Sequence, residues 1–423
     1  MFLLILAYLA LTVIRPQDYL PALSSMMLLP LALGGATLLW LFSRRRRFDQ
    51  PQYLLLGVFL LVGVVSRTLS DGMAAGVDQL QAFAPTFVAF VVLANAVDRP
   101  QRVRTTMTVL VLSTAILAIH GLVQARHGVA WTGVPMTSDH RIQYVGIFQD
   151  PNDLGLLFVS VIPMALYLSG AGGLRRLFWF ACAVLMIYGV YLTKSRGTML
   201  ALAAIFGVYM WRRRGLVPAG VLGVAALVVL KLLSPRMEEL GADEESAFGR
   251  VDAWYTGLHL LLEHPLFGVG VGNFTEYNYL TAHNSFVLVM AETGIIGYVP
   301  WLAFLCYGMW MALTVVRHRP DAERLAADAT LAQAWRRDYA AGLTLLLMQV
   351  GFLAAAFFLS RSYIILLYLL QALVVGYYTD VQERFPELPR FALSRDVLRW
   401  PLLAVASVVV MFVVVRVLLA TAS

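Results

Sequence analysis

The stretch HNSFVLVMAETGIIG, residues 283–297, decides the fold because it joins a polar pair to a long apolar run. His283 and Asn284 stand directly before this run, which continues to residue 316. Its length exceeds the roughly 20 residues that a helix needs to cross ~30 Å of hydrocarbon. The sequence therefore predicts an imidazole and an amide at the mouth of a membrane helix. Because polar, titratable groups are costly at a bilayer boundary, this pair is a candidate functional site.

Apolar runs of similar length recur along all 423 residues, of which 60% are hydrophobic and 13% charged, with a mean hydropathy of +0.74. A soluble helical protein could not cover this much apolar surface. We predict an all-α, polytopic integral-membrane protein that forms one domain over 1–423, with about 12 to 13 membrane helices. The expected spans are 1–14, 22–43, 52–66, 79–97, 105–124, 153–171, 177–193, 198–211, 216–233, 285–316, 341–360, 363–378 and 401–419.

The net charge of +7 predicts orientation rather than nucleic-acid binding. With the N-terminus in the cytoplasm, about two-thirds of the basic residues fall in cytoplasmic loops, as the positive-inside rule requires. Arg44–Arg47, Arg212–Arg214 and the arginines from Arg317 to Arg337 are examples. The largest hydrophilic loop, 234–283, is then periplasmic, and the arginines on that outer side are the ones that need an explanation.

Targeting and metal motifs are not evident in the sequence. The first apolar stretch has no basic leader and no small-residue cleavage site, so we expect a retained helix rather than a signal peptide. Cys182 and Cys306 fall inside predicted spans, which disfavours a disulfide or thiolate ligation of a metal. No HExxH, paired-cysteine or Asp-x-Asp motif occurs, so we predict neither a metal site nor a cofactor.

Two of the shorter outer loops have both a structural and a functional interpretation. In 125–152, Asp150-Pro151-Asn152 suits a turn, with Asn152 or Asp153 as the cap of the next helix, and polar contact with a sugar is the alternative. In Thr193–Gly197, Arg196 either snorkels to the interface or lies where an anionic headgroup would sit.

The large outer loop contains a helical pattern and a glycine-rich segment. Residues 248–264 place Val251, Trp254, Leu258, Leu261 and Leu262 on one face, which predicts an amphipathic helix in the membrane interface with its Trp at headgroup level. Arg250 stands at the N-terminal end of this helix, and the acidic run 238–245 before it suits a solvated stretch. Gly268-Val-Gly270-Val-Gly272 follows no strand, so it favours tight backbone packing over a dinucleotide site.

His283 itself is either a structural residue or an acid–base group. A histidine at a helix start, on the side away from cytosolic nucleotides and near arginines, favours acid–base chemistry. The arginines would neutralise phosphate, since a guanidinium binds phosphate oxygens in bidentate fashion. Glu292, two turns into the same helix, needs a partner if it is buried.

These residues resemble the O-antigen ligase and polymerase superfamily of bacterial envelope glycosyltransferases. The family signature is His followed by Asn, Ser or Gln, nine arbitrary residues and Gly-x-x-Gly, which His283-Asn284, 285–293, Gly294 and Gly297 fit without a gap. The resemblance extends to Phe148–Asn152, to Lys194–Gly197 and to Arg250-x-x-x-Trp254 before Pro265-x-x-Gly268, and so covers about 145–300. A thirteenth span departs from the twelve that family ligases usually have.

The resemblance implies a metal-independent, inverting glycosyltransferase of the bacterial inner membrane with a periplasmic active site. It would take a glycan from undecaprenyl diphosphate and pass it to lipid A-core, or to a growing polysaccharide if the protein is a polymerase. His283 would be the catalytic base, Arg196 and Arg250 would bind the diphosphate, and Asn284 would contact substrate. A polysaccharide transporter or flippase is the alternative of another class, but it should place charges within several helices around a central cavity.

Overall fold

The computed structural model describes residues 1–170, 172–218, 220–221, 223 and 242–422. Over these residues the chain is built from helices, and its only β-structure is an isolated bridge between Val129 and Pro135. The predicted all-α class is therefore confirmed. The predicted span 216–233, and the beginning of the predicted loop 234–283, fall largely outside the described residues.

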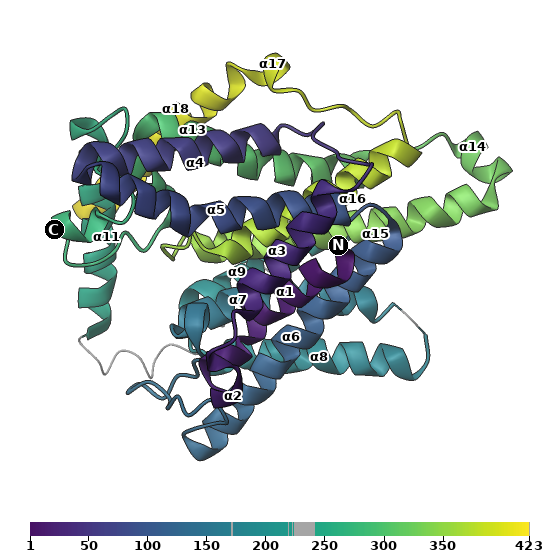
Figure 1. The fold of residues 1–423 in the computed structure, drawn as a ribbon, viewed down its shortest axis with the longest axis horizontal. Helices are drawn as coiled ribbons and strands as arrows, with labels where there is room; N and C mark the ends of the chain where they lie inside the picture. Colours follow the sequence, from purple (N-terminus) through teal and green to yellow (C-terminus); the bar gives the residue numbers. More distant parts are fainter. Residues whose placement is uncertain (171, 219, 222, 224–241, 423) are drawn as a thin grey trace.

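The helices follow one another along the chain, and the long described connections are 128–150 and 264–284 (Figure 1). Their bounds are α1 Phe2–Ile14, α2 Pro21–Ser24, α3 Leu28–Leu41, α4 Gln52–Asp71, α5 Met73–Ala96, α6 Pro100–His127, α7 Pro151–Leu168, α8 Leu174–Leu192, α9 Arg196–Arg214, α11 Ala242–Glu263, α12 Phe274–Tyr277, α13 Ser285–Arg317, α14 Ala322–Ala327, α15 Ala329–Ala356, α16 Ile365–Arg384, α17 Leu393–Asp396 and α18 Arg399–Ala422. Short 3₁₀ turns cover Pro16–Asp18 and Gly146–Phe148.

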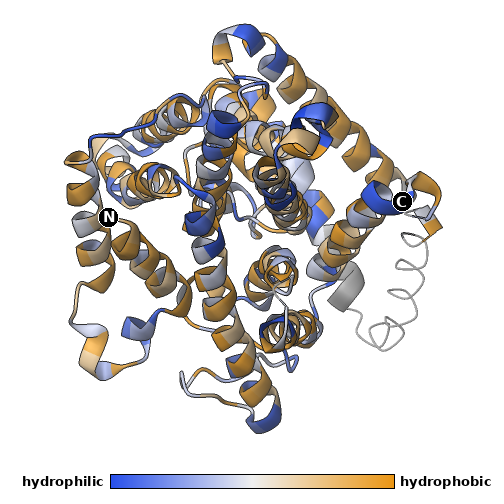
Figure 2. Ribbon diagram, turned by 90° about the vertical axis from the view of Figure 1, so that its right-hand side faces the viewer, coloured by the Kyte–Doolittle hydropathy of each residue, from blue (hydrophilic) through white to orange (hydrophobic). Residues whose placement is uncertain are grey.

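Within the described residues, nine helices are long and apolar enough to cross a membrane: α4, α5, α6, α7, α8, α13, α15, α16 and α18. The apolar helices α1 and α3 are shorter, and α9 carries arginines at both ends. Hydrophobic residues cover most turns of the bundle (Figure 2). Helix α16 is almost wholly buried, whereas α18 exposes most of its apolar side chains, as a helix at the lipid boundary does. These apolar helices indicate a polytopic membrane protein, as predicted.

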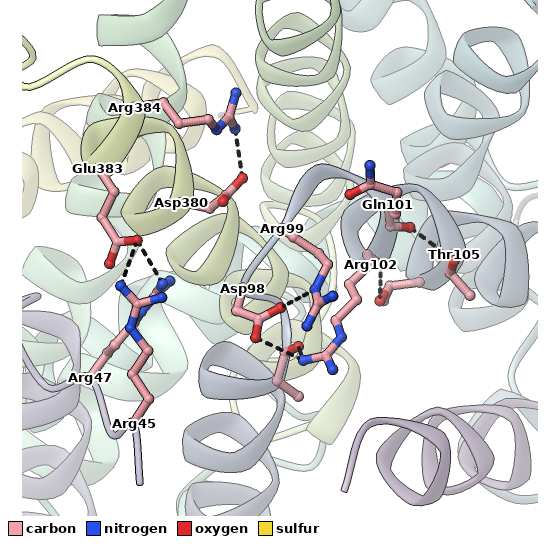
Figure 3. Close-up of polar contacts among 12 residues, drawn as sticks. Arg45, Arg47, Asp98, Arg99, Gln101, Arg102, Thr105, Asp380, Glu383 and Arg384 are labelled. Atoms are coloured by element: carbon pink, nitrogen blue, oxygen red, sulfur yellow. Dashed lines mark hydrogen bonds and ion pairs between the residues drawn. The ribbon is translucent and has the colours of Figure 1, made fainter. Parts of the chain in front are cut away.

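One end of the bundle gathers the predicted cytoplasmic loops into a network of ion pairs (Figure 3). Glu383 accepts from Arg45 at 3.3 Å and from Arg47 at 2.8 Å, which ties the α3–α4 connection to the end of α16. Asp98 pairs with Arg99 and Arg102 between α5 and α6. Loops that alternate along the sequence therefore meet at one end, as the basic-residue pattern predicts.

The opposite end of the bundle gathers the predicted outer loops. Helices α4, α5 and α16 each run from one end to the other, so that Asp71, Gly72 and Tyr363 lie far from the ion pairs of Figure 3. Figure 1 places α11 and α14 at opposite ends of the long axis. The residues singled out from the sequence are concentrated at the α11 end.

Candidate active site

The start of α13 fixes the position of His283. Asn284 is the N-cap, and its Oδ1 accepts from the backbone N–H of Phe286 at 2.9 Å and of Val287 at 3.1 Å. The cap satisfies two of the N–H groups that a helix leaves open at its N-terminus. His283 directly before it has φ +45°, a left-handed conformation that is uncommon for a residue with a side chain. Such strain persists only where neighbouring contacts hold the backbone.

Those contacts come from the connection between α15 and α16, residues 357–364. Thr281 donates from Oγ1 to Ser360 Oγ at 2.7 Å, and Ser285 donates from Oγ to the carbonyl of Leu359 at 2.6 Å. Ser362 in turn donates from Oγ to the carbonyl of Ser285 at 2.8 Å. His283 is therefore bracketed by hydrogen bonds on both sides of it along the chain.

The same connection brings in an arginine that the sequence interpretation did not select. Arg361 donates from its backbone N–H to Ser285 Oγ at 2.9 Å, which fixes it beside the His283 segment. Its guanidinium forms a two-pronged pair with Asp153, with Nε on Oδ1 and Nη2 on Oδ2. Asp153 is buried, while about a third of the Arg361 side chain is exposed (32%). Nη1 takes no part in this pair.

The N-terminus of α7 lies on the other side of Arg361, and its cap differs from the prediction. Asp150, rather than Asn152 or Asp153, caps the helix, since its Oδ1 accepts from the N–H of Asn152 at 2.7 Å. Pro151 occupies the first helical position, where it loses no hydrogen bond. Asn152 and Asp153 are thereby free to bind arginines: Arg141 donates from Nη2 to Asn152 Oδ1 at 2.8 Å.

The charges around His283 set its proton affinity. Burial lowers the pKa of His283, and the positive charges of Arg250 and Arg361 lower it as well, whereas Asp150 raises it. The imidazole is half-buried. His283 is therefore neutral at neutral pH and able to accept a proton, among two cations and one carboxylate from three other elements.

A cavity of about 440 Å³ opens at this point, and His283, Asp150 and Arg361 line it. Its volume falls within the range of roughly 300–1,000 Å³ that is usual for small-molecule sites. The cavity extends along α13 toward Glu292, which at nine residues from His283 lies about 13 Å further along the helix axis. The arrangement provides a proton acceptor and a cation in the wall of one pocket, with Arg250 near enough to act on His283.

The Gly-x-x-Gly of the motif interrupts α13 beside this cavity. Gly294 has φ +61° and ψ −167°, a backbone conformation that glycine adopts without strain. The regular helix hydrogen bonds are interrupted around it. The segment from Pro265 fills the gap: Ile295 N–H donates to the carbonyl of Pro265 at 2.9 Å. Val269 N–H donates to the carbonyl of Ala291 at 3.0 Å. A Cβ on Gly294 would lie 2.4 Å from the carbonyl carbon of Leu266, so the contact needs glycine.

The glycine-rich segment matches its predicted use. Gly268, Gly270 and Gly272 all have positive φ, and a Cβ on Gly268 would lie 2.4 Å from the carbonyl oxygen of Ala291. Gly270 N–H donates to the carbonyl of Glu292 at 3.1 Å. The segment is therefore packed backbone against backbone on the break in α13, next to the cavity.

The arginines predicted to bind diphosphate lie at different distances from the cavity. Arg250, in α11, is close enough to His283 to lower its pKa. Arg196 is exposed at the first position of α9, after Ser195 as N-cap. It adjoins the α15–α16 connection, since a Cβ on Gly197 would lie 3.1 Å from Phe358 Cβ. Neither Arg196 nor Arg250 is among the residues that line the cavity.

Two further predictions can be compared with the structure. Asn284 is fully buried, and its Nδ2 has no hydrogen-bond partner among the described residues, so that only this atom is left for a substrate contact.

The amphipathic helix exists as part of α11, but Trp254 is 6% exposed and its ring packs on Phe357 at 5.5 Å between centroids. The predicted headgroup position of Trp254 is therefore wrong, because the apolar face of α11 packs on protein. Leu262, assigned to that face, is 67% exposed. The side chains of 238–245 lie outside the description.

No group of three or more potential metal ligands occurs among the described His, Cys, Asp and Glu residues. Cys182 and Cys306 are both free thiols. The site that the structure describes is thus built from an imidazole, guanidinium groups and carboxylates.

Comparison with known families gives one match. The family model described as O-antigen ligase fits residues 181–302, from within α8 to within α13. These residues include Arg196, Arg250 and His283 and stop before Arg361. The resemblance inferred from the motif is therefore confirmed over this stretch, and it supports a membrane glycosyltransferase of the O-antigen ligase or polymerase type. No significant match exists among curated proteins.

Proposed function

We propose that this chain, with its O-antigen ligase match over 181–302, transfers a glycan from undecaprenyl diphosphate to lipid A-core. The reaction takes place on the periplasmic side of the bacterial inner membrane. The observation that carries the proposal is the position of His283, with lowered pKa, at a cavity that Arg361 also lines and beside the charge of Arg250. Acid–base and phosphate-binding groups meet at the bundle end that the basic-residue pattern assigns to the outside.

In the proposed step, a hydroxyl of the acceptor sugar gives its proton to a ring nitrogen of His283. The hydroxyl oxygen forms a bond to the anomeric carbon of the donor, and the bond from that carbon to the diphosphate oxygen breaks. The electron pair leaves with undecaprenyl diphosphate. A single displacement of this kind inverts the anomeric centre, and it needs no nucleotide because the diphosphate ester is already an activated donor.

Cationic side chains stabilise the leaving diphosphate. We assign Arg250 and Arg361 to this role beside His283, and Arg196 to the diphosphate at the start of α9. Preorganised charge of this kind acts most strongly where charge develops in the transition state. Asp153 holds the Arg361 guanidinium by two bonds, so the arginine loses little freedom on binding. Asn284 would contact substrate through Nδ2 only.

The test is His283→Ala in purified, membrane-reconstituted protein. Loss of a general base lowers the rate by about 10²- to 10⁴-fold. His127→Ala is the matched control, since His127 is exposed at the end of α6 and does not line the cavity. Normal transfer by His283→Ala would refute the assignment.

A polymerase of O-antigen or exopolysaccharide, which would use the growing polysaccharide as acceptor, agrees with the same family match. The lipopolysaccharide of a deletion strain separates the two. Loss of all long chains from lipid A-core indicates a ligase, and capping by single repeats indicates a polymerase.

A further inference from the structure

The end of the cavity away from His283 contains buried polar atoms without partners. Glu292 reaches the cavity from α13 and is 2% exposed, and Tyr363 reaches it from the α15–α16 connection. Among the residues that the structure describes, Oε2 of Glu292 and the hydroxyl of Tyr363 have no partner at normal hydrogen-bond geometry, although the two groups lie close enough to interact with each other. Unpaired buried groups of this kind cost free energy, and a bound ligand would relieve that cost.

The structural work of Glu292 does not use this oxygen. Its backbone carbonyl accepts from Ser66 Oγ at 2.6 Å and from Gly270 N–H at 3.1 Å. Its Oε1 accepts a long hydrogen bond, 3.4 Å, from Phe274 N–H. The Gly270 bond holds the glycine-rich segment, and the other two tie Glu292 to α4 and α12. Oε2 is therefore available for a different purpose.

The surroundings of Glu292 suit an uncharged polar ring. Phe83, Phe274 and Leu288 line the same cavity and supply apolar surface for the C–H face of a pyranose, while Gln79 adds a polar edge. The one cationic side chain that lines the cavity, Arg361, lies at the other end with His283, while Arg67 near Glu292 is paired with Asp71. In a glycan-diphosphate the negative charge is on the diphosphate, and a neutral sugar carries none. The diphosphate would therefore lie at the His283 end, and the sugar would lie along the cavity.

We propose that the Glu292 end of the cavity is a subsite for a neutral sugar ring, whose hydroxyls bond to Oε2 of Glu292 and to the Tyr363 hydroxyl. The inference rests on the proposed function, because it places the ring within reach of the reacting groups. A uronic acid fits this end poorly, since its carboxylate would be buried against the Glu292 carboxyl group and the only cation nearby, Arg67, is already paired with Asp71. The ring belongs either to the donor or to the acceptor.

The experiment measures the binding of three probes to purified protein in lipid nanodiscs. They are undecaprenyl diphosphate bearing the glycan repeat, undecaprenyl diphosphate without sugar, and the acceptor glycolipid. Glu292→Gln keeps the shape and one carbonyl oxygen, while Tyr363→Phe removes one hydroxyl. Asp380→Asn and Tyr298→Phe are matched controls, since neither residue lines the cavity.

Glu292→Gln should weaken binding of the sugar-bearing probe by about ten- to a hundred-fold, as expected when a buried sugar hydroxyl loses its acceptor. It should leave the sugar-free diphosphate unchanged. Tyr363→Phe should act in the same direction with a smaller effect, about three- to ten-fold. Weaker binding of the glycan-bearing diphosphate assigns the ring to the donor, and weaker binding of the acceptor glycolipid assigns it to the acceptor.

Equal affinity of wild type and both variants for all probes would overturn the subsite, because water then satisfies Oε2. Equal weakening of the sugar-bearing and sugar-free diphosphates would overturn it as well, since the effect would be structural. If wild-type protein bound none of the probes and transferred no glycan, the proposed function itself would fail. The failure of the subsite and that of the function are thus separate results.

Discussion

Removing Arg361 should cost stability and activity for two separable reasons. In Arg361→Ala the Asp153 carboxylate, whose side chain is 4% exposed, would stay buried without its counter-charge. Breaking a buried pair by removing one partner typically costs about 3–5 kcal/mol. Because 32% of the Arg361 side chain is exposed, water can reach part of the pair, and we expect a loss of about 2–3 kcal/mol.

The reverse change should be milder. Asp153→Asn keeps an oxygen that accepts from Arg361, and the guanidinium can turn toward water, so we expect a loss of about 1 kcal/mol. The double variant Arg361→Ala/Asp153→Asn no longer buries a charge. Its loss should fall short of the sum of the two single losses by about 1–2 kcal/mol, which is the coupling energy of the pair.

The assay combines two measurements on the same preparations. The free energy of unfolding is measured by titration with a denaturing detergent and far-ultraviolet circular dichroism, and glycan transfer is measured in nanodiscs. The double variant should regain stability relative to Arg361→Ala but no activity, since the phosphate-binding group is still absent. Strictly additive losses would refute the ion-pair reasoning, and full transfer by Arg361→Ala would remove Arg361 from the site.

Four further outcomes are expected. Arg196→Lys and Arg250→Lys should each impair transfer at normal expression, because an ammonium lacks the paired donors of a guanidinium; full activity of both would favour simple snorkelling. Arg250→Gln should move the acidic limb of the pH–rate profile to higher pH, since Arg250 lowers the pKa of His283 and the neutral imidazole is the active form; an unmoved limb would separate Arg250 from His283. In a chain without its native cysteines, an impermeant thiol reagent should label Ser138→Cys in intact spheroplasts and Gln101→Cys only after lysis; the opposite pattern would invert the topology. Transfer should persist in excess EDTA, with arginines as the charge-stabilising groups; loss on chelation with rescue by magnesium would contradict this.

The sequence predicts the nine spanning helices of the described residues because the length and apolarity of a segment are sufficient to place a membrane helix, whereas the helices at the predicted spans 1–14, 22–43 and 198–211 are not among these nine. It does not predict how such a helix is broken. The apolar run after Asn284 reads as one span of unusual length, and the structure divides it at Gly294. The break depends on the Pro265–Gly272 segment, which supplies the missing hydrogen-bond partners. A local pattern of glycines indicates tight packing, but it does not indicate which segment packs against them.

The candidate site was predictable only where its residues stand in a motif. His283, Arg250 and Arg196 belong to spaced patterns, whereas Arg361 stands in a short connection and its partner Asp153 is 208 positions away. One signal was present: Arg361 is an arginine on the predicted outer side, where the positive-inside rule leaves it unexplained. The error at Trp254 has a different cause, since an amphipathic pattern has the same form whether its apolar face meets lipid or another helix.

The cations beside His283 couple donor binding to base strength under the proposed function. Without donor, Arg250 and Arg361 lower the pKa of His283, so the imidazole is a weak base. A bound diphosphate neutralises these charges, so the pKa of His283 then rises, while the lowering by burial, which is the largest cause, remains. The base is therefore strongest when the leaving group is in place, and it becomes weaker again when undecaprenyl diphosphate departs, which favours release of the proton. The acidic limb of the pH profile of kcat should consequently lie at higher pH than the acidic limb of kcat/KM, which reports the free protein.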